Sequence, residues 1–228
     1  MLHVEYVQSG SGLREAVNAG AGQKHLLAET RPVLKDNRRE TRIWVFALAD
    51  SDEGKIGAIE NSAVVNPAIG RISSGFRTAP MNQPVGVTVD QIMHGEAQHS
   101  GADLVVCALC FDRAVVAHNG SACCYLIRHN HATRLTLGNV RLIDYQIQPG
   151  DVLLLSGHSL QSVKGSEMAE IAGHRVDLAM ASEKLTELAK QRGESVNLGL
   201  LMIRVLSVER SNRAQNERAR SSAVRARA

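Results

Sequence analysis

The sequence is poor in aromatic residues and has no long apolar run. Among 228 residues it contains one Trp, three Tyr and three Phe, or 3%. The core must therefore be built from aliphatic residues, chiefly Val, Leu, Ile and Ala. No apolar run reaches the roughly 18 residues of a membrane-spanning helix. The first residues also lack the basic and apolar regions of a signal peptide. We therefore expect a soluble protein of the cytoplasm.

Cysteine is scarce too, and its placement argues against metal or redox chemistry. Cys107 and Cys110 have the CxxC spacing of a zinc or redox site. Both lie in the apolar run 104–111, and Cys123 and Cys124 lie in a second strand-like run. Free Cys is a common core residue, and a domain of this size needs no disulfide framework. We expect four core cysteines.

The positive charge is concentrated at the end of the chain. The formal net charge is +3, and six arginines with a single opposing Glu follow position 209. Residues 1–208 are expected to form one domain. Residues 209–228 cannot bury enough apolar surface to repay their ordering entropy, so they predict a basic tail, flexible or a helix extension. Nucleic-acid binding by this tail is disfavoured because no binding motif accompanies it.

The apolar pattern predicts mainly antiparallel strands with covering helices. Strands are expected at 2–8, 43–49, 103–110, 113–119, 121–128, 132–137, 141–147, 152–155 and 198–206. Helices are expected at 55–69, 87–98, 161–172 and 178–191. Residues 71–86 predict an irregular excursion, and 35–42 a charged turn. The pair Asn119-Gly120 predicts a tight hairpin turn.

Several segments follow one another in the order of a known family's motifs. His118-Asn-Gly-Ser-Ala-Cys-Cys-Tyr-Leu126 is similar to Asn-x-Gly-Asp-Ser-Arg-x-Tyr-Leu, and Leu135-Thr136 to the Leu-Thr pair that follows. Pro149-Gly150-Asp151 precedes an apolar strand that in the family ends in Ser-Asp-Gly-Leu. Ser195-Val-Asn197 stands where the family has an Asp-Asn pair before its last strand. The chain thus resembles the metal-dependent Ser/Thr protein phosphatases, the type-2C or PPM family.

The resemblance covers about residues 12–206 and implies an α+β fold. That fold is a four-layer αββα sandwich, with two mainly antiparallel β-sheets flanked by helices. In the family, a pair of Mn²⁺ or Mg²⁺ ions lies in a cleft at one end of the sandwich and activates a water that attacks the phosphate. Several aspartates hold the ions, because hard cations prefer carboxylate oxygens.

Most of these aspartates are missing from this chain. Asp50 matches the bridging Asp, and Ser51 replaces the Gly after it. His158, after Gly157, stands at the Asp of Ser-Asp-Gly-Leu. These three residues, Asp50, Ser51 and His158, are the candidate remnants of the metal site. The degenerate positions are Gly20, Ser121, Gly157, Val196 and Asn197. Ser121 replaces the turn Asp, Val196 the last Asp, and Gly20 the acidic end of a weakly matched N-terminal element.

We therefore expect a pseudophosphatase, a catalytically inactive phosphatase-like domain that acts as a binding or regulatory module in signalling. Its partner would be a kinase or a phosphoprotein, and no cofactor is expected. One alternative is a divergent active phosphatase in which Asp50, Asp52, Glu53 and His158 rebuild a Mn²⁺ or Mg²⁺ site. A single transition metal at Asp50 and His158 is another. A third is a different fold with a structural or small-ligand role, which a mostly parallel sheet would support. The compact form suggests a bacterial origin, and the oligomeric state stays open.

Overall fold

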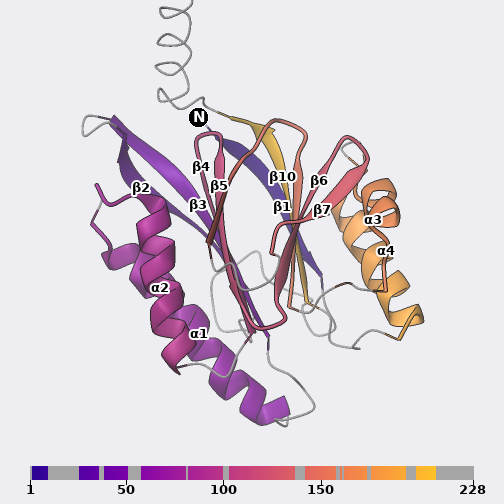
Figure 1. Ribbon diagram of the computed structural model, residues 1–228, viewed down its shortest axis with the longest axis horizontal. Coiled ribbons are helices and arrows are strands. Elements are labelled where there is room, and N and C mark those ends of the chain that lie inside the picture. The colour runs from indigo at the N-terminus through magenta and orange to yellow at the C-terminus, as the bar shows by residue number, and fades with distance from the viewer. Residues whose placement is uncertain are drawn as a thin grey trace, which may run out of the picture.

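The computed structural model describes residues 2–9, 26–35, 39–50, 58–80, 82–99, 103–136, 142–157, 160, 162–173, 176–193 and 199–208. Within them, ten β-strands and four α-helices form four layers. Two helices cover one side of a pair of facing sheets, and two cover the other side (Figure 1). The αββα sandwich expected from the sequence is confirmed.

Each of the two sheets has five strands, and every pairing within them is antiparallel. Sheet 1 has the order β2 (Leu26–Lys35), β3 (Arg39–Asp50), β4 (Asp103–Cys110), β5 (Arg113–Asn119) and β8 (Leu142–Gln146). Sheet 2 has the order β1 (His3–Ser9), β10 (Leu200–Ser207), β9 (Val152–Ser156), β6 (Cys123–Arg128) and β7 (His131–Arg134). The antiparallel pairing excludes the mostly parallel alternative.

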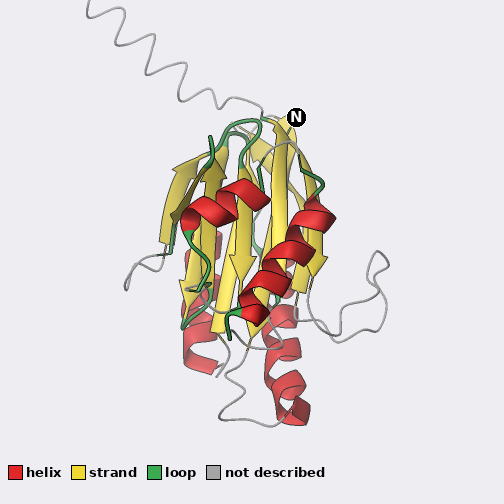
Figure 2. Ribbon diagram, turned by 90° about the vertical axis from the view of Figure 1, so that its right-hand side faces the viewer, coloured by secondary structure: helices red, strands yellow, loops and turns green. Residues whose placement is uncertain are grey.

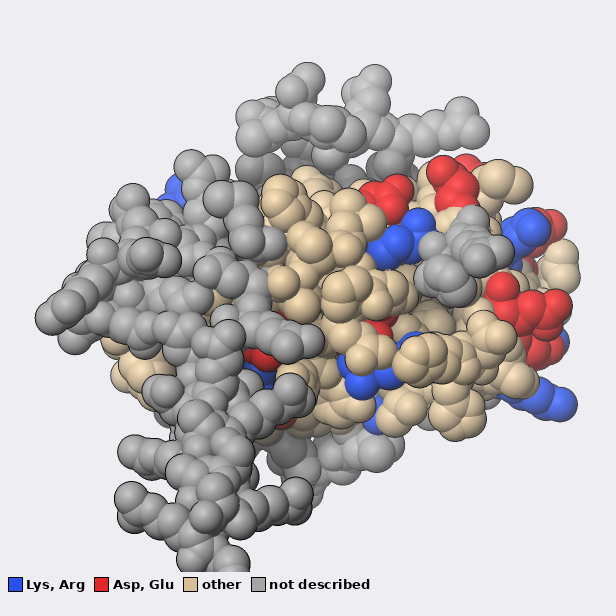
Figure 3. All heavy atoms as spheres, turned by 90° about the horizontal axis from the view of Figure 1, so that it is seen from above, with Lys and Arg blue, Asp and Glu red and all other residues tan. Residues whose placement is uncertain are grey.

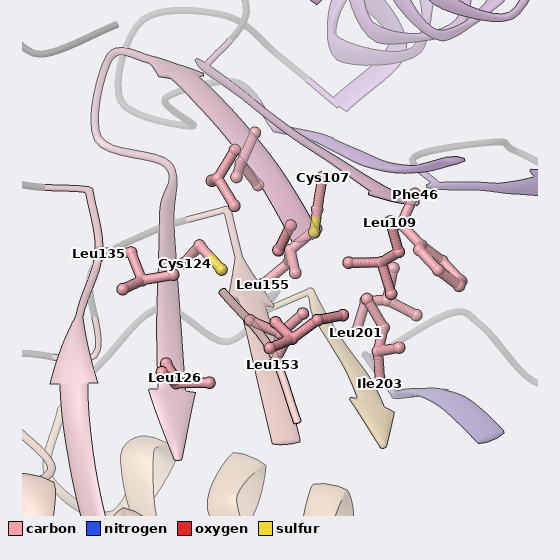
Figure 4. Close-up of a cluster of buried hydrophobic side chains, with 14 of the residues drawn as sticks. Phe46, Cys107, Leu109, Cys124, Leu126, Leu135, Leu153, Leu155, Leu201 and Ile203 are labelled. Carbon is pink, nitrogen blue, oxygen red and sulfur yellow. The ribbon is translucent and has the colours of Figure 1, made fainter. Parts of the chain in front are cut away.

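The space between the sheets is filled mainly by aliphatic side chains, with two buried thiols and Phe46 among them. Alternate residues of a strand point to opposite faces, so Phe46 faces the other sheet while Val45 faces the helices. Figure 4 shows side chains of both sheets meeting in this layer. Fully buried members include Phe46, Cys107, Leu109, Cys124, Leu153, Leu155, Leu201 and Ile203. The scarcity of aromatic residues is thus met by branched aliphatic ones.

Helices α1 (Ala58–Thr78) and α2 (Val85–His99) cover sheet 1, and they correct the expected irregular excursion at 71–86. Helix α1 continues through Pro67 because Ile69, Ile72 and Phe76 are buried against the sheet. Each such burial is worth about 1.5–3 kcal/mol, against about 3 kcal/mol for a Pro inside a helix. Neither α1 nor any other described helix is long and apolar enough to cross a membrane.

Helices α3 (Gly165–Ile171) and α4 (Leu178–Gln191) cover sheet 2 (Figure 2). Helix α4 begins after Asp177, whose side chain accepts a hydrogen bond from the backbone N–H of Met180 at 3.0 Å. This is the usual role of an N-cap Asp. The apolar stripe of α4 is buried on the sheet, as the spacing of its leucines predicts.

The segment 35–42, expected as a charged turn, is mostly strand. Strand β2 ends at Lys35 and β3 begins at Arg39, and these two residues are Cα partners in the hairpin. Strand β2 is the edge of sheet 1, which explains how it includes Pro32: an edge strand leaves backbone N–H groups unpaired. The predicted turn therefore extends too far at both ends, because Lys35 and residues 39–42 belong to strands. The predicted basic tail at 209–228 lies outside the described residues.

Candidate functional site

Several strand ends meet at one end of the sandwich, at the bottom of Figure 1. Strand β3 ends at Asp50 and β4 begins at Asp103, and the two aspartates are Cα partners. Ser121 lies in the β5–β6 turn, Gly157 follows β9, and Gly199 precedes β10. The backbone N–H of Gly157 donates to the carbonyl oxygen of Gly199 at 3.4 Å. We call this region the Asp103 end.

The β5–β6 turn passes from one sheet to the other, which corrects the expected hairpin at Asn119-Gly120. Strand β5 pairs with β4 and β8 in sheet 1, whereas β6 pairs with β7 and β9 in sheet 2. The turn signal itself is right, because Gly120 has a φ of +67°. A Cβ at position 120 would lie 1.7 Å from Oδ1 of Asp103. Only Gly fits there.

Asp103 makes the most specific polar contact of this end. Its Oδ2 accepts hydrogen bonds from the backbone N–H of Ser121 at 3.0 Å and from the Ser121 hydroxyl. The same hydroxyl oxygen lies 3.4 Å from the carbonyl oxygen of Gly157. Because the hydroxyl donates its single proton to the carboxylate, this contact is not a second hydrogen bond. Ser121 therefore binds the β5–β6 turn to β4 of sheet 1, and it only lies next to the end of β9 in sheet 2.

Sequence reasoning misses Asp103. In the sequence it is only the polar start of an apolar strand, and nothing local marks it as a contact of a turn 18 residues away. A usable signal is its place in register: β4 and β5 form a short hairpin, so the residue before Leu104 must lie near the residue after Asn119. In an antiparallel pair, such opposite positions are neighbours.

The predicted site residues are only partly covered by the structure. The backbone of Asp50 ends β3, and Ser121 and Gly157 meet at the Asp103 end. The remaining candidates lie outside the described residues: Gly20, Ser51, Asp52, Glu53, His158, Val196 and Asn197. Over the described part of the chain, no group of three or more His, Cys, Asp or Glu side chains is arranged to hold a metal ion.

All four cysteines are free and buried, as the sequence predicted. Burial raises the pKa of Cys107 to about 12 and raises the pKa of Cys124 well above its ordinary value. Thiols with raised pKa values are poor nucleophiles and metal ligands at neutral pH. The CxxC spacing of Cys107 and Cys110 therefore reflects packing on the two faces of β4.

The histidines outside the loop at 158 are expected from the sequence to be exposed turn residues. His129 fits, since it is exposed in the β6–β7 turn with a φ of +48°. His118 does not: it lies on β5, half-buried, with both ring nitrogens shielded from solvent. Residues 114 and 116 of β5 face the other sheet, so alternation places His118 on that inner face too, near the Asp103 end.

The opposite end of the sandwich carries an ion pair between the half-buried Arg128 and the buried Asp151. Arg128, at the end of β6, donates from Nε and Nη2 to the two carboxylate oxygens of Asp151 at 2.7 and 2.6 Å. Asp151 belongs to the predicted Pro-Gly-Asp turn and is 1% exposed. A pocket of 440 Å³ lies beside this pair. Seen from this end, acidic and basic side chains lie next to one another on the described surface (Figure 3).

No protein-family model matches the sequence, and no curated protein is significantly similar to it. Solved structures do match. The catalytic domain of the Ser/Thr phosphatase PstP, in complex with two manganese ions, is 15% identical, with a TM-score of 0.58 over 91% of this chain and 100% of that one. PppA, a regulatory component of the T6SS in Pseudomonas aeruginosa, is 14% identical, with a TM-score of 0.56 over 90% and 98%.

The phosphatase domain of SpoIIE from Bacillus subtilis, solved with a fragment of its regulatory domain, is 12% identical, with a TM-score of 0.61. That match covers 90% of this chain and 62% of the SpoIIE chain. At such identities the likeness concerns the fold, and the same fold recurs in all three proteins. This likeness also agrees with the observed layers, the antiparallel sheets and the order of strands and helices. The chain therefore has the fold of the metal-dependent Ser/Thr protein phosphatases, the type-2C or PPM family.

Proposed function

We propose that this chain is a catalytically inactive, phosphatase-like domain that serves as a binding module in signalling. The observation that carries the proposal is at position 121. The family's turn motif has an Asp there, and this chain has Ser121, a hydrogen-bond donor to Asp103. The Asp103 carboxylate is thus already engaged by two donors from the turn.

The residues at the other metal-ligand positions of the family support the same proposal. His158 and Val196 stand where the family motifs have aspartates, and Gly20 ends the N-terminal element without an acidic residue. Two hard dications at one site need several carboxylates, both as ligands and to reduce the repulsion between the ions. Among the matched acidic positions, Asp50 alone retains its aspartate. The residues present therefore do not fit a Mn²⁺ or Mg²⁺ pair.

The role of the module is proposed from the fold and from its neighbours. PppA, which shares the fold, is described as a regulatory component. A domain that keeps the scaffold of a phosphatase without its ligands retains a surface shaped for a phosphorylated protein. We therefore propose that the partner is a phosphoprotein or the kinase that produces it, bound at the Asp103 end.

The test is turnover of a phosphopeptide and of an aryl phosphate by the purified chain, with Mn²⁺, Mg²⁺ and Zn²⁺ in turn. An active phosphatase of this fold serves as the positive control, and Asp50→Asn as the matched variant. We expect no turnover above that of Asp50→Asn with any metal, and no rise in Tm on adding Mn²⁺. Metal-dependent turnover that disappears in Asp50→Asn would show a rebuilt catalytic site instead.

A further inference from the structure

We propose that Asp103 is a positioning residue: through Ser121 it holds the β5–β6 turn, and with it β6 and the paired end of β9, in place against sheet 1. This role adds to the proposed function and rests on it in one respect only: the Asp103 end is the surface offered to a partner. The geometry behind it is two hydrogen bonds from the β5–β6 turn to Asp103 on β4, together with the pairing of β6 with β9, in which Cys123 is the partner of Ser156.

Asp103 is itself held firmly. Its backbone starts β4, the central strand of sheet 1, with β3 on one side and β5 on the other. It is the Cα partner of Asp50, and the next residue, Leu104, is the partner of Asn119. A carboxylate on such a rigid strand is well suited to fix a turn. Because the turn crosses between the sheets, fixing it also sets how β6 and β9 lie relative to sheet 1.

Steric fit shows how closely the carboxylate and the turn are matched. Oδ1 of Asp103 lies where a Cβ of residue 120 would be, so the carboxylate fills the space that Gly120 leaves open. Oδ2 takes both donors of Ser121. Oδ2 is therefore fixed by two hydrogen bonds, and the position of Oδ1 requires a residue without a Cβ at position 120.

The pair has the opposite polarity to the motif that the chain resembles. There the turn supplies the carboxylate; here the turn supplies donors and β4 supplies the carboxylate. An Asp at position 121 would place two carboxylates in contact, and like charges at such close range are destabilising. An amide at position 103 facing a carboxylate at 121 would instead restore one donor–acceptor contact.

The experiment is a double-mutant cycle of Asp103→Asn, Ser121→Asp and the double variant, with Asp144→Asn as control. Asp144 is an exposed Asp on β8 whose side chain pairs with Arg113. The two readouts are Tm and the amide resonance of Gly157 in ¹H–¹⁵N spectra. Each single change is expected to lower Tm by about 5 °C and to shift the Gly157 resonance. In the double variant, both values should return at least halfway to those of the parent, since the pair is rebuilt with reversed polarity.

The control should leave the Gly157 resonance unchanged. If Ser121→Asp does not fold, Asp103→Asn and the double variant still decide the matter. An unchanged Gly157 resonance in Asp103→Asn, or a double variant less stable than the sum of the single losses, would overturn the positioning role. Metal-dependent turnover would overturn the proposed function and leave this role standing, so the two failures are distinguishable.

Discussion

Position 120 illustrates how one residue can be dictated by two constraints at once. Gly120 has a φ of +67°, which costs an L-residue roughly 1–2 kcal/mol. Its missing Cβ also leaves room for the Asp103 carboxylate, 1.7 Å from where that atom would be. Glycines that have a positive φ but open space where a Cβ would lie provide a direct comparison.

We predict that Gly120→Ala lowers the free energy of unfolding by about 3 kcal/mol, because loss of the Asp103–Ser121 contact adds to the backbone strain. The matched control is Gly150→Ala. Gly150 has a φ of +91° and no atom within 4 Å of the place where a Cβ would lie, so about 1–2 kcal/mol is expected. Urea unfolding of both variants measures the difference. Equal losses would mean that the Asp103 carboxylate imposes no steric constraint.

At the scale of elements, α3 and α4 are joined by an exposed charge pair. Arg192 donates from Nη1 and Nη2 to the two carboxylate oxygens of Glu167, each at 2.7 Å. Glu167 also accepts from the backbone N–H of Lys164 at 2.9 Å, as in a capping box. The hydrogen bond from Arg192, and then that from Lys164, lower the pKa of Glu167 from 4.5 to about 2.

A lowered pKa in the folded state means that the unfolded chain binds the proton more readily. The contribution of Glu167 is therefore complete above its unfolded pKa of about 4.5 and is lost as the pH falls to about 2. We predict that Glu167→Gln is less stable than the parent at pH 7, and that the difference shrinks between pH 4.5 and 2. Urea midpoints over this range measure it. A difference independent of pH would show that the charge of Glu167 is not involved.

Helix α1 shows what local pattern can and cannot reveal about an element. Its Ala-rich start predicts a helix, but Pro67 and the Ser, Gly and Pro after it predict that the helix stops. Propensity is a weak local term, and Phe76 and Ile72 outweigh it by burial against sheet 1. Close packing at Gly75, where a Cβ would come within 2.8 Å of Ile92, likewise depends on α2 and could not be inferred from α1 alone.

For the whole molecule, the two sheets are tied by polar contacts at both ends. At the Asp103 end, Ser121, in the turn that leads into sheet 2, donates to Asp103 of sheet 1. At the opposite end, Arg128 of sheet 2 binds Asp151 and also donates from Nη2 to the carbonyl oxygen of Gln146, in sheet 1, at 2.9 Å. The aliphatic layer between the sheets is non-directional, so these contacts help to define how the sheets are aligned.

We predict that Asp151→Asn lowers the free energy of unfolding by about 3 kcal/mol, because it leaves the Arg128 guanidinium without its charge partner. Asp144→Asn, which breaks the exposed pair with Arg113, should cost less than about 1 kcal/mol. Urea or guanidinium unfolding of the two variants under identical conditions tests this. Similar small losses in both would show that the Arg128–Asp151 pair adds little to stability.

The sequence by itself determined the apolar strands, the burial of the four cysteines, the tight turn at Asn119-Gly120 and the loss of acidic residues at several motif positions. These features depend on residue type and short-range spacing, which the chain carries locally. Only the tertiary structure decided that this turn crosses between the sheets, that α1 continues past Pro67, and that Asp103 meets Ser121. Each of those outcomes depends on contacts between segments distant in sequence, whose register is set by packing of the sheets and helices rather than by any local pattern.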